Sequence, residues 1–319
     1  MITKTPLLTL LAGSLLFLTA GGCSASRTAV PGMSGVKPEI IPHSGWEAHP
    51  PLGHDAHATR RNLAPRDTLR FGDLTLSVVE AIAGDTTSSD SLVVALKSRG
   101  LSEAITVAEG SAMVWGEYRL AVLAIHLGED ELGRGLSELE VARASTVPDA
   151  IRLSADAGGP AERLRVRHTP THITLHHSGS AKPLTPEEDP VEKLKNLQTW
   201  GESDRGWWDV PYHFLIDLDG NIYEGRFFEY MGETNTRYNP AGHLLISVLG
   251  NYNLQEPTDA QLSAITDLMT RAASEFGIPI DNIQGHSDLA PTACPGDHLR
   301  KYLDDGSFKA WVGGRPTNR

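Results

Sequence analysis

The segment from Gly285 to Gly296 most constrains what this chain can fold into, because it places a cysteine eight positions after a histidine. Cys294 is one of only two cysteines in the chain, and a turn marked by prolines and glycine separates it from His286. A thiolate and an imidazole held together suit a borderline-soft divalent metal such as Zn²⁺. A third protein ligand would leave one coordination position open, as in catalytic rather than structural zinc sites. The fold must therefore bring a third ligand to this turn from another part of the chain.

Composition limits the classes of protein to consider. The chain has 319 residues, enough for one large domain or two modest ones with a substantial core. Its hydrophobic content of 40% and charged content of 21% are ordinary for a soluble globular protein. The net charge of −12 argues against a nucleic-acid partner, because the phosphate backbone attracts basic surfaces.

Residues 1–22 are predicted to be an export signal rather than part of the fold. A lysine precedes an apolar run that ends in small residues and Cys23. The run is too short to span a bilayer comfortably and fits a cleaved secretory signal. It resembles a bacterial lipoprotein signal, in which Cys23 becomes the lipidated first residue, although Ala20 stands where that motif usually has leucine. An ordinary cleaved signal, with Cys23 incidental, is the alternative.

A lipid on Cys23 would also settle how the two cysteines are used. Two cysteines in an exported protein first suggest one disulfide, but lipidation of Cys23 leaves Cys294 as a thiol or thiolate. Residues 23–37 are small and polar and are predicted to form a tether. We therefore expect an exported, membrane-anchored lipoprotein that faces the periplasm or cell wall, at the outer membrane if the cell has two membranes.

Residues 66–150 are predicted to form a small, mainly-β accessory module. Partly alternating apolar runs indicate strands, and glycine-containing turns separate them. The expected strands are residues 68–71, 74–79, 91–96 and 118–125. No catalytic constellation is evident in this module.

Residues 151–319 are predicted to form an α/β domain with a mixed central β-sheet flanked by helices. Strands are expected at 171–177, 212–217, 221–225 and 243–249, and helices at 185–200 and 258–276. Asp219-Gly220 is a strong hairpin signal between the second and third of these strands. Both helices open on a capping-box pattern, and this order of elements indicates a mixed sheet.

The first expected strand of this domain offers two candidates for the third metal ligand. His176 and His177 are adjacent at its end, so their side chains point to opposite faces and only one can reach a given site. His172 and Thr174 share the face of His176. Spacing alone does not choose between the two histidines.

Several motifs then occur in an order that resembles a known enzyme family. They are Leu175–Ser178, Val210–Phe214, Tyr223–Arg226 and the segment Gly285–Gly296. Together, across about residues 166–305, they resemble the zinc-dependent N-acetylmuramoyl-L-alanine amidases. That superfamily includes phage lysozyme-type amidases and the catalytic peptidoglycan recognition proteins.

The resemblance implies a role for five residues. His176 falls on the first metal ligand of the family, His286 on the second and Cys294 on the third. Tyr212 matches the active-site tyrosine, with a sheet tyrosine as the alternative. Thr292 matches the residue that assists the oxyanion, and it is threonine in the recognition-protein members as it is here. A hydroxyl that only stabilises the turn is the alternative for Thr292.

The resemblance also implies a reaction and its partners. We expect a Zn²⁺-dependent N-acetylmuramoyl-L-alanine amidase that acts on peptidoglycan or muropeptides as a monomer. It would cleave the amide between N-acetylmuramic acid and L-alanine. A non-hydrolytic peptidoglycan-binding lipoprotein is the alternative.

Residues 38–65 leave the domain order open. Ile40–Ala48 resembles the opening strand segment of recognition-protein domains, although His43 stands where they usually have arginine. If residues 38–65 open the amidase domain, the β module is inserted into that domain; otherwise the module precedes it.

Overall fold

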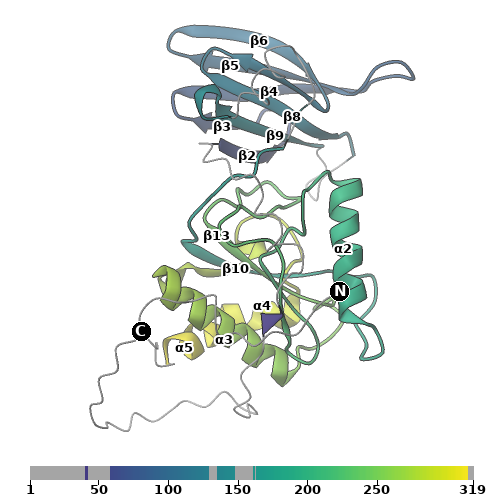
Figure 1. The fold of residues 1–319 in the computed structure, drawn as a ribbon, viewed down its shortest axis with the longest axis vertical. Coiled ribbons are helices and arrows are strands. Elements are labelled where there is room, and N and C mark those ends of the chain that lie inside the picture. Colours follow the sequence, from purple (N-terminus) through teal and green to yellow (C-terminus); the bar gives the residue numbers. More distant parts are fainter. Residues whose placement is uncertain (1–39, 42–57, 129–134, 148–160, 162, 315–319) are drawn as a thin grey trace.

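The computed structural model describes residues 40–41, 58–128, 135–147, 161 and 163–314. The predicted export signal, tether and lipidated Cys23 lie outside these described residues. Among the helices that the structure describes, none is long and apolar enough to cross a bilayer. Figure 1 shows antiparallel sheets at one end of the molecule and a mixed sheet with helices at the other.

The mixed sheet has six strands in the order β1-β12-β11-β13-β10-β14. Neighbouring strands are parallel, except that β11 and β12 form the expected hairpin. Every residue of β13 is buried, which is typical of a parallel strand covered on both faces. The strands are β1 (Ile40–Ile41), β10 (His172–His177), β11 (Phe214–Ile216), β12 (Ile222–Glu224), β13 (His243–Val248) and β14 (Ile283–Gly285). The expected α/β fold with a mixed sheet is confirmed.

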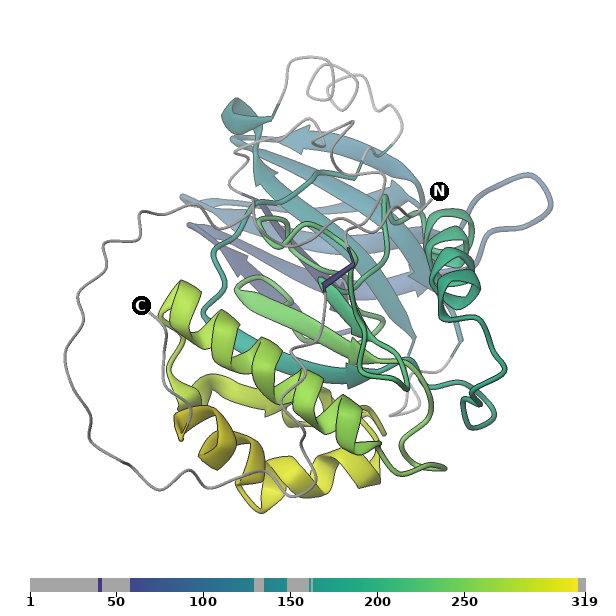
Figure 2. The same cartoon turned by 60° about the horizontal axis from the view of Figure 1, so that its bottom comes forward.

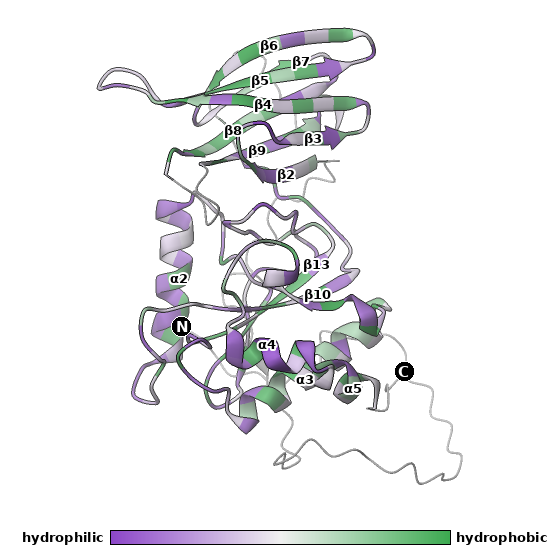
Figure 3. Ribbon diagram, turned by 180° about the vertical axis from the view of Figure 1, so that it is seen from behind, coloured by the Kyte–Doolittle hydropathy of each residue, from purple (hydrophilic) through white to green (hydrophobic). Residues whose placement is uncertain are grey.

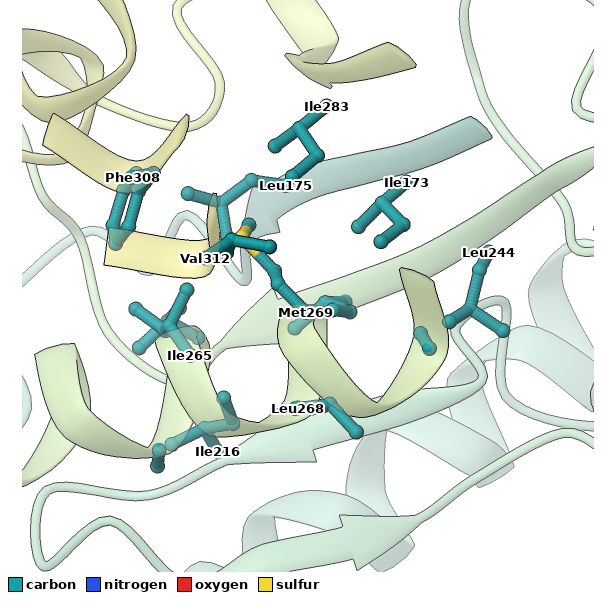
Figure 4. Packing of buried hydrophobic residues seen from close by; sticks show 14 of the residues in the cluster. Ile173, Leu175, Ile216, Leu244, Ile265, Leu268, Met269, Ile283, Phe308 and Val312 are labelled. Atoms are coloured by element: carbon teal, nitrogen blue, oxygen red, sulfur yellow. The ribbon is translucent and has the colours of Figure 1, made fainter. Parts of the chain in front are cut away.

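Helices α3 (Asp259–Phe276), α4 (Asp297–Asp304) and α5 (Ser307–Gly313) lie together on one face of this sheet (Figure 2). The bounds of α3 follow from its ends: Thr258 forms a reciprocal capping box, and Gly277, with φ of 64°, ends the helix. The apolar side of α3 packs in one buried cluster with Ile173, Leu244 and neighbouring sheet residues (Figure 4). Short 3₁₀ turns are η1 (Ala144–Thr146), η2 (Ile280–Asn282) and η3 (His286–Asp288).

Helix α2 (Pro190–Asp204) begins later than the sequence predicts. Glu188 Oε1 accepts a hydrogen bond from the amide of Thr185, as in a capping box, but this contact closes only a turn. Pro190 explains the difference, because a proline disfavours helical geometry in the residue before it and is suited to the first helical position. Asp189 is extended, and its carboxylate caps α2 by accepting from the amide of Val191.

Residues 58–128 and 135–143 fold as two four-stranded antiparallel sheets, β2-β9-β8-β7 and β3-β4-β5-β6. Both sheets contribute side chains to one apolar cluster, so they form a sandwich, and Figure 3 shows hydrophobic and hydrophilic residues alternating along its strands. The strands are β2 (Ala58–Leu63), β3 (Thr68–Phe71), β4 (Leu74–Ile82), β5 (Ser91–Ser98), β6 (Leu101–Ala108), β7 (Ser111–Trp115), β8 (Tyr118–His126) and β9 (Leu136–Arg143). The mainly-β accessory module is present, with strands β2, β6, β7 and β9 in addition to those expected. It begins at Ala58 rather than at residue 66, because β2, which lies in the possible amidase segment of residues 38–65, pairs with β9 of the sandwich.

The path of the chain links the sandwich to the mixed sheet twice. Strand β1 precedes the sandwich in sequence, yet it pairs in parallel with β12 of the mixed sheet. The chain then forms β2 to β9 and returns to the mixed sheet at β10. The first and last strands of the sandwich pair with each other, with Ala58 opposite Ala142, so the chain enters and leaves the sandwich at neighbouring points.

A buried network of charges joins the sandwich to the mixed sheet. The carboxylate of Glu233 pairs with Arg60 of β2 and, at 3.0 Å, with Arg226. Arg60 also pairs with Glu140 of β9 at 2.7 Å, and each of these four side chains is at most 4% exposed. Burial opposes ionisation of Glu233, but Arg60, Arg226 and Arg163 outweigh it and lower its pKa to about 2.

Removing the charge of Glu233 should destabilise the protein strongly. Glu233→Gln keeps the shape of the side chain but removes the carboxylate that pairs with buried Arg226 and one of the carboxylates that pair with Arg60. Removing one partner of a buried ion pair typically costs about 3–5 kcal/mol. The free energy of unfolding in urea measures the loss. Glu229→Gln is the matched control, because Glu229 pairs with Arg167 at the surface and should contribute less than about 1 kcal/mol. If both changes lowered the free energy of unfolding by the same small amount, the buried charge of Glu233 would not be needed for stability.

Candidate metal centre

Three buried side chains converge beside the end of β10. His176, His286 and Cys294 each offer one ligand atom, and these atoms lie within 4.8 Å of one another. This is the one grouping of three such side chains within the described part of the chain. The structure thus brings together the three residues that the sequence singled out as metal ligands.

Hydrogen bonds within the segment that follows β14 hold His286 next to Cys294. The amide of Ser287 donates to the carbonyl of Cys294 at 3.0 Å, which closes the intervening loop. The carboxylate of Asp288 accepts from the amide of Gly285 at 2.8 Å and pairs with Arg300 at 2.6 Å. Asp288 therefore holds the turn that carries His286.

Gly296 is required at the end of this segment. Its φ of 91° is unfavourable for residues with a side chain, and a Cβ there would lie 2.5 Å from the carbonyl carbon of Tyr252. The segment therefore packs directly against backbone, which fixes the position of Cys294 two residues earlier.

The two adjacent histidines of β10 have different partners. His177 turns to the opposite side of the strand from His176, where its Nδ1 accepts from the amide of Tyr252 at 3.2 Å. His176 Nδ1 instead lies 3.6 Å from Cys294 Sγ. The main-chain amide of His177 donates to the same sulfur at 3.3 Å, a contact that favours the thiolate.

A loop before β13 supplies a hydroxyl to each histidine of the cluster. Thr236 Oγ1 lies 2.7 Å from His286 Nε2, and Tyr238 Oη lies 3.4 Å from His176 Nε2. We assign the proton to Nε2 in both rings, so that it is donated to the hydroxyl and the lone pair remains on Nδ1. Both rings then present a nitrogen that can bind a metal.

Burial keeps both imidazoles neutral. Desolvation lowers the pKa of His286 to about 4, and it lowers the pKa of His176 well below its ordinary value, with the neighbouring His286 adding to the effect. A metal competes with protons for the same lone pair, so neutral imidazoles favour metal binding at neutral pH.

Tyr212 and Thr292 occupy different surroundings. The ring of Tyr212 lies 5.2 Å from the ring of His176, which brings it to the cluster. Burial, and then the nearby Cys294, raises the pKa of the Tyr212 hydroxyl, which is therefore even less prone to lose its proton than an exposed tyrosine. Thr292 Oγ1 accepts from the amide of Cys294 at 3.2 Å, a contact that stabilises the turn.

Sequence reasoning missed Thr236 and Tyr238. Both lie outside helices and strands, and their contacts depend on how the loop folds back over the cluster. The one feature of the sequence that could have pointed to these two residues is their position shortly before the apolar strand that begins at His243. His243 and His213 contribute to the sheet instead: His243 bonds to Thr174, and His213 bonds to the backbone of two neighbouring segments.

The fold and the cluster together define an α/β protein with a buried two-histidine, one-cysteine centre. A family model described as N-acetylmuramoyl-L-alanine amidase matches residues 166–297. Peptidoglycan-recognition protein SC2 of Drosophila simulans is 36% identical over 130 residues, which are 40% of this chain and 70% of that protein. The chain therefore belongs to the superfamily of N-acetylmuramoyl-L-alanine amidases and peptidoglycan recognition proteins.

Two further similarities were found. Human N-acetylmuramoyl-L-alanine amidase is 31% identical over 149 residues, which are 46% of this chain and 26% of the human protein. The solved structure of Drosophila PGRP-LB matches with a TM-score of 0.41 and 24% identity, over 47% of this chain and 90% of that one.

Buried neutral histidines should make the protein sensitive to mild acid. Burial lowers the pKa of both His168 and His243 to about 4, from 6.5. Between these values the unfolded chain binds protons that the folded chain does not, so the free energy of unfolding falls as pH falls from 6.5 toward 4. Urea unfolding at about pH 7 and pH 5 should reveal a loss of up to about 2 kcal/mol for each such histidine.

His168→Asn provides a control for this prediction. The asparagine oxygen can still accept from the amide of Gly242, as His168 Nδ1 does at 2.8 Å, but the side chain does not titrate. The variant should therefore lose less stability between the two pH values than the unaltered protein. Equal stability of the unaltered protein at both values would show that its histidines are not held neutral by burial.

Proposed function

We propose that this protein is a zinc-dependent N-acetylmuramoyl-L-alanine amidase that hydrolyses the amide between N-acetylmuramic acid and L-alanine in peptidoglycan. The observation that carries the proposal is the buried cluster of His176, His286 and Cys294 in a chain of this family. Three ligands leave one coordination position open for chemistry.

The donor set fits zinc. Two imidazoles and a thiolate are the ligand types that zinc prefers, and hard cations such as Mg²⁺ prefer oxygen. His176, His286 and Cys294 would hold the ion through the two Nδ1 atoms and the sulfur. Zinc bound there supplies a Lewis acid that polarises a carbonyl and lowers the pKa of water to about 7.

Tyr212 would act on the substrate directly. Its hydroxyl is protonated at neutral pH, and burial raises its pKa further, so it is a hydrogen-bond donor beside the cluster. We assign it the role of stabilising the carbonyl oxygen of the scissile amide as negative charge develops there. Losing one such donor typically lowers the rate about 10²–10³-fold.

The alternative is binding without hydrolysis. The relatives include recognition proteins as well as amidases, so family membership is compatible with either activity. The complete ligand set favours hydrolysis, because binding alone needs no buried thiolate between two neutral histidines.

The N-terminus belongs to the same proposal. A lipid on Cys23 would tether the enzyme to a membrane by the chain that precedes β1, with the catalytic domain exported to the compartment that contains peptidoglycan. The basis is the sequence of residues 1–23, and it also leaves Cys294 available as a metal ligand.

The two adjacent histidines give a matched test of the metal centre. His176→Asn should abolish stoichiometric zinc binding and the release of dye from labelled cell wall, because it removes a ligand. His177→Asn should retain most of both, because the asparagine oxygen can still accept from the amide of Tyr252. Elemental analysis of the purified variants measures zinc, and mass analysis of the released muropeptides identifies the cleaved bond. Zinc bound without dye release from the unaltered protein would favour the binding alternative.

The hydroxyl of Thr236 should set the affinity for zinc. Thr236→Val keeps the shape of the side chain but removes the partner of His286 Nε2, and losses of this kind lower metal affinity about 10–100-fold. Thr236→Ser keeps the hydroxyl and should bind nearly as tightly as the unaltered protein. Competition with a fluorescent chelator measures both affinities, and equal values for valine and serine would remove Thr236 from this role.

A further inference from the structure

A pocket of about 550 Å³ lies at the junction between the sandwich and the amidase domain. Arg61, Asn62 and Asp67 line it from the sandwich, and Arg237, Tyr238 and Pro291 line it from the amidase side. Neither domain forms this pocket alone.

The pocket adjoins the metal centre through two shared elements. The Tyr238 hydroxyl that contacts His176 belongs to a side chain that also lines the pocket. Pro291 lies on the loop between His286 and Cys294 and also lines the pocket. A molecule whose reacting bond lies at the cluster could therefore extend past Tyr238 into the pocket.

Asn62 holds the shared wall in place. Its Nδ2 donates to the carbonyl of Thr234 at 2.7 Å and to that of Thr236 at 2.9 Å. The sandwich is therefore bonded to the loop that carries Tyr238, so the two sides of the pocket are fixed relative to each other.

The charges that line the pocket leave one cation uncompensated. Asp67 pairs with Arg237 at 2.6 Å. Arg61 donates from Nη2 to the carbonyl of Arg237 at 3.2 Å, and its buried Nε has no hydrogen-bond partner among the described residues. Two arginines and one aspartate therefore leave the lining of the pocket with one positive charge in excess.

We propose that Arg61 binds a carboxylate of the substrate's peptide stem, so that the sandwich supplies part of the substrate-binding cleft. This inference rests on the proposed action on peptidoglycan. A guanidinium presents parallel N–H donors that match the two oxygens of a carboxylate. The single uncompensated charge suits a monoanion, because Asp67 would repel a more highly charged group such as a phosphate.

The remaining lining fits the same ligand. Leu63, Leu289 and Ala290 add apolar surface to the pocket. An amino-acid side chain that ends in a carboxylate has an aliphatic part that this surface can contact, while the carboxylate reaches Arg61.

A pair of muropeptides tests the assignment. One carries free carboxylates on its stem, and the other is the same compound with those carboxylates amidated. Arg61→Gln should raise KM for the acidic muropeptide about 10–100-fold, the range for losing a charge-assisted hydrogen bond, with kcat within about twofold. For the amidated muropeptide, Arg61→Gln and the unaltered protein should have similar KM values.

Two further variants serve as controls. Arg70→Gln removes an exposed arginine of β3 that does not line the pocket, and it should leave KM unchanged for both compounds. Arg61→Lys keeps the charge but loses the two parallel N–H donors of the guanidinium. Its KM for the acidic compound should therefore lie between those of the glutamine variant and the unaltered protein. This variant also serves if Arg61→Gln does not fold.

The outcomes separate this inference from the proposed hydrolysis. Cleavage of the acidic muropeptide with equal KM in Arg61→Gln and the unaltered protein overturns the carboxylate site and leaves the amidase in place. If the unaltered protein cleaves neither compound, the dissociation constants of both muropeptides, measured by calorimetry, are compared instead of KM. Weaker binding of only the acidic compound by Arg61→Gln then supports the site without hydrolysis, and equal binding overturns it.

Discussion

The buried carboxylate of Glu233 is the contact on which the rest of this structure depends. It lies between Arg226 of the amidase domain and Arg60 of the sandwich, which Glu140 also neutralises, so it links the charges of the two parts in a low-dielectric junction. The loop that starts at this carboxylate carries Thr236 and Tyr238 to the two histidines of the cluster. The attachment of the sandwich and the shape of the metal centre are therefore parts of one arrangement.

The metal centre owes its geometry to protein contacts made around the ligands. A hydroxyl orients each histidine of the cluster, and a backbone amide from β10 donates to the sulfur of Cys294. Burial holds the histidines neutral, and the same burial raises the pKa of the Tyr212 hydroxyl still further above neutrality. In the proposed mechanism, the same low-dielectric site would therefore offer acceptor nitrogens to a cation and a donor hydroxyl to an oxyanion.

Sequence predicted the parts of the structure that local interactions determine. Helix α3 could be placed because Thr258 and Gly277 cap it through neighbouring residues. Strands β2 and β9 were missed because buried Arg60 and Glu140 do not follow an apolar alternation, and their charges are balanced by partners on other strands and segments. The metal ligands could be predicted because they lie in local sequence motifs. Thr236 could not be predicted, because its contact exists only once the loop has folded.

The pairing of Ala58 with Ala142 has a consequence for how such a protein can vary. A folded unit whose entry and exit points are neighbours can take the place of a short surface loop. Such a unit can be inserted or exchanged with little disturbance of the sheet that carries it. The side chains that reach the Glu233 loop from Arg60, Arg61, Asn62 and Asp67 all come from the first strand of the unit and the turn after it. The exposed positions of the outer sheet β3-β4-β5-β6 make none of these contacts, so they can differ in sequence without changing the junction with the mixed sheet.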